Sequence, residues 1–117
     1  MSGIQASAGI ANVLSNYEAK TFTVTTGTTD YDVATNNTNM FGGAASKLTA
    51  QNKQRNVIKI VSNQDITVKY NQTTNDGILV KSSESPYYET FINAQNVFIT
   101  NTSGSTATIT MVCYYVN

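Results

Sequence analysis

The strongest candidates for metal-binding or catalytic residues in this chain are two pairs of carboxylates. Asp30 and Asp32 stand two apart in an alternating segment, which on a strand places both carboxylates on one face. With an oxygen-rich loop nearby, such a pair could help to hold Ca²⁺, although a solvated strand face explains the same spacing. Glu84 and Glu89 flank Pro86, and a carboxylate pair held at a suitable separation could hydrolyse a glycoside. Nothing in the sequence spacing fixes the separation of Glu84 and Glu89. We therefore expect both carboxylate pairs to be ordinary polar surface residues.

The residues that are missing restrict the chemistry further. The 117 residues include no histidine, no tryptophan and a single cysteine, Cys113. Without histidine, the Ser-His-Asp and Cys-His arrangements cannot be built, and the commonest metal ligand is lacking. Cys113 stands in an apolar row with no basic cluster nearby, which favours a buried structural thiol over a nucleophile. We therefore expect a protein without enzymatic activity, metal or cofactor.

Charge and hydropathy narrow the partners that the chain can have. The net charge is zero and 12% of the residues are charged, so no electrostatic footprint for nucleic acid or anionic lipid is visible. No apolar run is long enough to cross a bilayer, and the first residues lack the basic and apolar regions of a signal peptide. Together with the single cysteine, these features predict folding in a cytosol, without a nucleic-acid or membrane partner.

A hydrophobic period of two predicts an all-β chain. From Lys20 onward, Phe22 and Val24 alternate with threonines, as expected of a half-buried strand. Turn signals such as the Asn-Asp-Gly at 75–77 separate further short runs of this kind. No segment of helical period follows a strand, which argues against parallel βαβ units. About eight strands are expected, at residues 20–25, 30–33, 57–61, 66–70, 78–81, 87–92, 96–100 and 106–116.

The chain divides into an N-terminal arm, residues 1–19, and a single antiparallel β-sandwich domain, residues 20–117. Its length fits one domain with one sandwich core. The arm is small, polar and weakly apolar, and a short helix over residues 6–17 is an alternative that Gly9 weakens. The apolar members of the alternating runs are expected in the core: Ile58, Ile60, Ile66, Val68, Ile99, Ile109 and Met111.

Apolar residues outside this core are the candidates for contacts with other subunits. The arm has too few large apolar residues to make its own core, yet too many for a spacer. A long polar loop, residues 34–54, carries a Met-Phe pair that could act as an anchor. Tyrosine offers a flat apolar face and a polar tip, which suits protein contacts and sugar stacking. The predicted contact residues are Ile4, Ile10, Val13, Leu14, Met40, Phe41, Tyr87 and Tyr88.

The second half of the chain resembles small β-sandwich virion proteins of tailed bacteriophages. The resemblance covers about residues 55–117. It consists of an apolar strand ending in Phe-Ile-Thr-Asn at 98–101, a tight Ser-Gly-Ser turn at 103–105 and a long alternating strand at 106–116. It implies a jelly-roll-like fold and a role on the particle, as head decoration, head fibre or tail-associated adaptor. It carries over no catalytic residue.

The composition is suited to the same role, because a neutral domain rich in Thr and Asn has little charge to desolvate on repetitive assembly. We therefore expect a non-enzymatic virion protein that is made in the host cytoplasm. It would assemble as a trimer or dimer and bind other virion proteins, such as a major capsid or tail protein. The alternative is a carbohydrate- or receptor-binding adhesion module, with exposed tyrosine and asparagine side chains as its ligand contacts.

Overall fold

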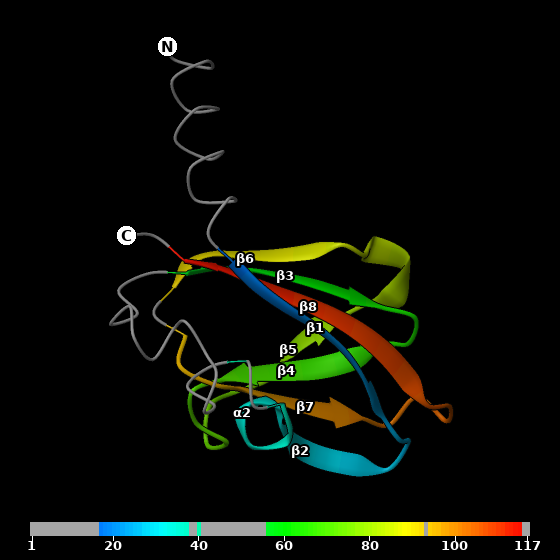
Figure 1. The fold of residues 1–117 in the computed structure, drawn as a ribbon. Coiled ribbons are helices and arrows are strands. Elements are labelled where there is room, and N and C mark those ends of the chain that lie inside the picture. Colours follow the sequence, from blue (N-terminus) through cyan, green and yellow to red (C-terminus); the bar gives the residue numbers. More distant parts are fainter. Residues whose placement is uncertain (1–16, 38–39, 41–55, 93, 116–117) are drawn as a thin grey trace.

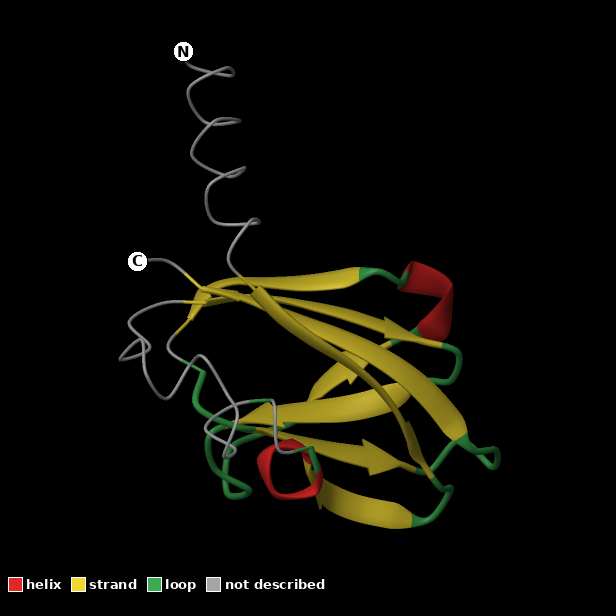
Figure 2. Ribbon diagram, viewed as in Figure 1, coloured by secondary structure: helices red, strands yellow, loops and turns green. Residues whose placement is uncertain are grey.

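The computed structural model describes residues 17–37, 40, 56–92 and 94–115, which form a sandwich of strands (Figures 1 and 2). Its strands are β1 (Tyr17–Val24), β2 (Thr28–Asp32), β3 (Asn56–Ser62), β4 (Ile66–Tyr70), β5 (Ile78–Val80), β6 (Tyr87–Ile92), β7 (Val97–Asn101) and β8 (Ala107–Tyr115). Two short helical segments accompany them, α2 (Val33–Asn36) and the 3-10 turn η1 (Ser82–Glu84). The strands form two four-stranded sheets, in the orders β1-β8-β3-β6 and β2-β7-β4-β5, and the sheets lie in two layers. The predicted antiparallel β-sandwich is confirmed.

The strand pairs are nested within one another. β1 pairs with β8, β2 with β7, β3 with β6 and β4 with β5, all antiparallel. The chain therefore follows the path of one long antiparallel hairpin whose tip is the β4–β5 pair. Pairing of β8 with β3 and of β7 with β4 rolls this hairpin into the two sheets. A rolled hairpin of eight strands is the topology of a jelly roll, as expected.

The core lies between the two sheets and consists of the alternating apolar residues. Every second residue of β7 is buried, and so is every second residue of β8 from Ala107 to Cys113, as the two-residue period of a strand requires. All seven residues predicted for the core are at most 1% exposed. Other apolar side chains complete the cluster, among them Phe22, Val24, Val33, Met40 and Val80. Burying an aliphatic side chain of this size contributes about 1.5–3 kcal/mol, so removal of one of them weakens the fold substantially.

β1 begins earlier than the sequence predicts. Residues 17–19, expected in the arm, pair with β8, and Tyr17 lies opposite Tyr114. The apolar alternation starts only at Phe22, but the long strand β8 offers backbone hydrogen-bonding groups to these earlier residues as well. The remaining residues of the arm, 1–16, lie outside the described residues.

A short helix replaces the expected end of the second strand. Val33 was predicted to continue the alternation, whereas it starts α2 and remains buried. Asp32 causes the change, because its Oδ1 accepts a hydrogen bond from the Thr35 backbone N–H at 3.0 Å and so caps the helix. The loop predicted at 34–54 thus begins as helix, and residues 38–39 and 41–55 lie outside the described residues.

Candidate interaction surface

Asp30 and Asp32 both make contacts that stabilise the fold. A β-bulge between Thr28 and Tyr31 breaks the alternation on which the calcium hypothesis rested, and Asp30 adopts a φ of 53° within it. Asp30 Oδ1 lies 3.2 Å from Lys69 Nζ, forming an ion pair on the outer side of the second sheet. Among the described residues, no group of three or more His, Cys, Asp or Glu side chains is placed to hold a metal ion.

Asp32 is held by hydrogen bonds from two elements. Besides the Thr35 N–H, its Oδ1 accepts the Asn96 side-chain N–H at 2.8 Å. Burial tends to raise the pKa of the Asp32 carboxyl. The hydrogen bonds from Asn96, Thr35 and Ala34 outweigh burial and lower the pKa below its ordinary value of 3.8. The carboxylate is therefore a charged structural link between β2, α2 and the start of β7.

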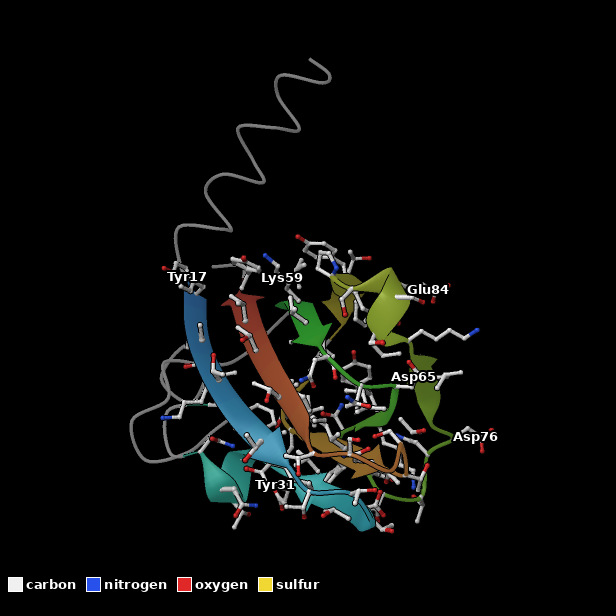
Figure 3. The ribbon with its side chains drawn as sticks, turned by 90° about the vertical axis from the view of Figure 1, so that its right-hand side faces the viewer. Tyr17, Tyr31, Lys59, Asp65, Asp76 and Glu84 are labelled. Atoms are coloured by element: carbon white, nitrogen blue, oxygen red, sulfur yellow. The ribbon has the colours of Figure 1, made fainter. Side chains whose placement is uncertain are left out.

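The two glutamates considered for glycoside hydrolysis lie in different surroundings. Glu84 is exposed on η1, across the molecule from Tyr17 in Figure 3. Glu89 lies opposite the buried Ile58, and its Oε1 accepts the Tyr87 hydroxyl at 2.7 Å. Burial, together with the hydrogen bond to Glu89 and its charge, raises the pKa of Tyr87 to about 12. Glu89 is thus engaged with a tyrosine of its own strand.

The predicted contact residues are divided between core and surface. Met40 is fully buried, and Tyr87 is partly buried and packs against the core. Tyr88 is 50% exposed on β6. Four arm residues and one loop residue lie outside the described residues: Ile4, Ile10, Val13, Leu14 and Phe41.

Tyr88 belongs to an apolar surface on the outer side of the sheet β1-β8-β3-β6, which we call the outer face. The strand register arranges this face in rows across the sheet, because residues directly opposite each other share a side. The rows are Tyr17–Tyr114–Val57, Ala19–Val112–Lys59–Tyr88 and Thr21–Thr110–Val61. Figure 3 shows Tyr17 and Lys59 together along one margin of the molecule, with Tyr31 well below them.

Aromatic and branched aliphatic side chains dominate the outer face. Tyr17 is 47% exposed and Val61 is 37% exposed. The rings of Tyr17 and Tyr114 pack against each other, with their centroids 5.7 Å apart and an interplanar angle of 56°. Lys59 is the one charged residue among the described positions of these rows. The outer side of the other sheet differs, since it carries the Lys69–Asp30 ion pair.

The sequence analysis missed this face because it looked for strands with apolar residues on one side only. The outer face is formed by strands that carry apolar residues on both sides. β3 and β8 carry apolar residues on both sides: Val57 and Val61 beside the buried isoleucines, and Val112 between Met111 and Cys113. Strands that are apolar on both sides are expected where both faces are covered. On the outer side of a sheet in a single copy, the same pattern leaves apolar side chains partly exposed to solvent.

No family model matches the chain, and no curated protein is recognisably similar to it in sequence. None of the helices in the described part of the chain is long and apolar enough to cross a membrane.

Proposed function

We propose that this chain is a non-enzymatic structural protein of a bacteriophage particle that assembles through protein–protein contacts. It would be a capsid decoration or auxiliary head protein, or a component associated with a fibre or the tail. The observation that carries the proposal is the outer face, an apolar and aromatic surface with one charge in its described rows. Burying such a surface against a neighbour costs little desolvation and gains about 25 cal/mol for each Å² of apolar area.

The topology supports the same proposal by analogy. Jelly rolls recur in viral capsid domains, although they also occur in lectins and cupins, so the fold narrows the function without fixing it. The strand and turn pattern of residues 98–116 adds the resemblance to small virion proteins of tailed phages. A domain that offers one apolar face suits a particle built from many identical contacts.

A carbohydrate-binding adhesion module is the second candidate, and the exposed rings of Tyr17 and Tyr88 favour it. Sugar recognition combines aromatic stacking with hydrogen-bonding groups that fix the hydroxyls. The described rows of the outer face offer threonine hydroxyls and one lysine, but no asparagine or glutamine amide. We therefore favour a protein partner over a glycan.

Particle composition tests the proposal directly. Virus-sized particles from cultures of the source organism are purified on a density gradient, and their proteins are identified by mass spectrometry. Peptides of this chain should migrate with intact particles and remain after a salt wash. The proposal is wrong if the chain is abundant in the lysate but absent from the particles. Binding of the purified protein to a glycan array, lost in a Tyr17→Ala/Tyr88→Ala variant, would favour the adhesion module.

A further inference from the structure

The Asp76–Gly77 step lies in the exposed loop between β4 and β5. Every residue from 71 to 79 is exposed, and Figure 3 shows the Asp76 side chain at the periphery of the molecule. An aspartate followed by glycine is prone to cyclise, because glycine has no Cβ to hinder the approach of the carboxyl to the next backbone nitrogen. The chain has four aspartates, and the other three are followed by Tyr31, Val33 and Ile66.

The Asp76 carboxylate also differs from the other three in its contacts. Asp30 forms the ion pair with Lys69, and Asp32 caps α2. Asp65 Oδ1 accepts a backbone N–H of η1 at 2.9 Å. Within the described part of the chain, Asp76 has no hydrogen bond or ion pair. Its carboxyl is therefore the one that the fold does not hold away from a reaction with the backbone.

The hydrogen bonds of this loop end before Asp76. The Asn75 backbone N–H donates to the Gln72 carbonyl oxygen at 3.3 Å, and the Asn75 side chain donates to the Tyr70 carbonyl oxygen at 2.8 Å. Neither Asp76 nor Gly77 takes part in the bonds that organise the loop, and β5 begins directly after Gly77. The Asp76 side chain is thus free to rotate toward the Gly77 nitrogen, as at other exposed loop tips.

We propose that Asp76 is a site of spontaneous covalent modification, at which the chain isomerises to isoaspartate through a succinimide. The Gly77 nitrogen bonds to Asp76 Cγ of the protonated carboxyl, the Cγ–O bond breaks, and the hydroxyl leaves with the N–H proton as water. Water then adds to either carbonyl of the ring. Addition at Cγ restores aspartate, whereas addition at the backbone carbonyl carbon leaves the chain running through Cγ. One water is lost and one regained, so the mass is unchanged and no oxidant is needed.

The modification would alter the backbone directly before β5, because isoaspartate adds one methylene to the main chain. β5 has three residues and pairs with β4, with Ile78 opposite Val68. Gly77 lies so close to Thr67 that a Cβ at residue 77 would meet the Thr67 methyl. A longer backbone disturbs this contact and the register of β5, so the isomerised chain should unfold more easily. The inference is independent of the proposed function, which concerns the outer face of the other sheet.

Ageing of the purified full chain at 37 °C tests the proposal. Isoaspartate is located by digestion and electron-transfer fragmentation in a mass spectrometer, and peptides that carry Asp30, Asp32 and Asp65 are internal controls. We expect isoaspartate to accumulate at residue 76 several-fold faster than at these positions. It should form faster at pH 5 than at pH 8, because the neutral carboxyl loses its hydroxyl more readily. Asp76→Glu keeps the charge but must close a larger ring, so the modification should be lost.

The same ageing in guanidinium chloride distinguishes the effect of the fold from that of the sequence. The native chain should isomerise at nearly the rate of the unfolded chain, because the loop leaves the step free. Isoaspartate that forms in denaturant but not in the native chain overturns the proposal, as does its absence from both. Aged wild-type chain should also contain a population that melts below the fresh chain, and aged Asp76→Glu should not. Isoaspartate without such a population contradicts the effect on β5.

Discussion

Phe22 and Tyr31 stack across the gap between the two sheets, with their ring centroids 5.4 Å apart and their planes 10° from parallel. Phe22 belongs to β1 and Tyr31 to β2, the edge strands on the same side of the two sheets. The turn between these strands carries the chain from one sheet to the other. The stack therefore closes the sandwich along this side, where each sheet ends.

Replacing the inner ring of this stack should weaken the fold strongly. Phe22→Ala removes a buried ring and its aromatic partner contact, and we expect a loss of about 3–5 kcal/mol in the free energy of unfolding. Tyr31→Phe keeps the stacked ring and removes a hydroxyl whose contact with Asn37 Nδ2 is long, 3.4 Å, so it should cost less than about 1 kcal/mol. Urea unfolding measures both values. Equal losses in the two variants would show that stacking is not the main contribution.

The local side-chain pattern predicted the strands and the core. One side of each strand faces the core and the other faces solvent, so apolar and polar residues alternate within the strand itself. Ile58, Ile60 and Ile109 illustrate this, since each is the buried member of an alternating run. The order of the strands is not a local property. It was expected only through the resemblance of residues 55–117 to known sandwiches.

The parts that the sequence did not reveal depend on the backbone or on more distant residues. The bulge at Asp30 arises from a positive φ that no side-chain pattern reports. Asp32 ends a strand by capping a helix and by accepting a bond from Asn96, 64 residues away. The outer face became visible only once the register had placed Val57, Val112 and Tyr17 on the same side of one sheet.

Gly77 is required by the close approach of Thr67. A Cβ at residue 77 would collide with the Cγ2 methyl of Thr67, on the strand that pairs with β5. Gly77→Ala should therefore destabilise the protein by about 1–3 kcal/mol through overpacking. Thr67→Ser removes the methyl and keeps the hydroxyl, so the double variant Gly77→Ala/Thr67→Ser should recover most of the loss. Thermal unfolding of the four proteins in this cycle checks the coupling, and additive losses would contradict it.

Removing the hydroxyl should change the stability of the fold in opposite directions at two inward-facing tyrosines. The Tyr70 hydroxyl is buried and has no hydrogen-bond partner among the described residues, whereas the Tyr87 hydroxyl donates to Glu89. Tyr70→Phe should be neutral or stabilise by up to about 1 kcal/mol, because an unsatisfied polar group is removed. Tyr87→Phe should destabilise by about 1–2 kcal/mol, since a half-buried carboxylate loses a donor. Denaturant unfolding at pH 7 distinguishes them, and a large loss for Tyr70→Phe would indicate an unrecognised partner.

The same tyrosines should make the fold sensitive to alkali. Burial raises the pKa of Tyr70, as do the charge of Glu89 and the neighbouring Tyr87, and the pKa of Tyr87 is raised to about 12. An unfolded tyrosine loses its proton near pH 10, so the stability from the protonated native form is present below pH 10 and declines as the pH rises toward 12. Tyr87→Phe should flatten this decline. An unchanged profile between pH 9 and 12 would show that Tyr87 titrates as in the unfolded chain.

Asp32 should make the fold sensitive to acid, in the opposite direction. Its folded pKa lies below the unfolded value of 3.8, so its charged form stabilises the native state above that pH and this stabilisation is lost as the pH falls further. Asp32→Ala removes the helix cap and the acceptor for Asn96, and at pH 7 we expect a loss of about 1–2 kcal/mol. The difference from wild type should shrink in urea titrations between pH 4 and pH 2, because protonated Asp32 is a poorer acceptor. Asp76→Ala, at an exposed carboxylate beside Gly77, is the matched control and should cost less than about 0.5 kcal/mol throughout. A difference between Asp32→Ala and wild type that stays constant with pH would show that the cap works through shape and hydrogen bonding without its charge.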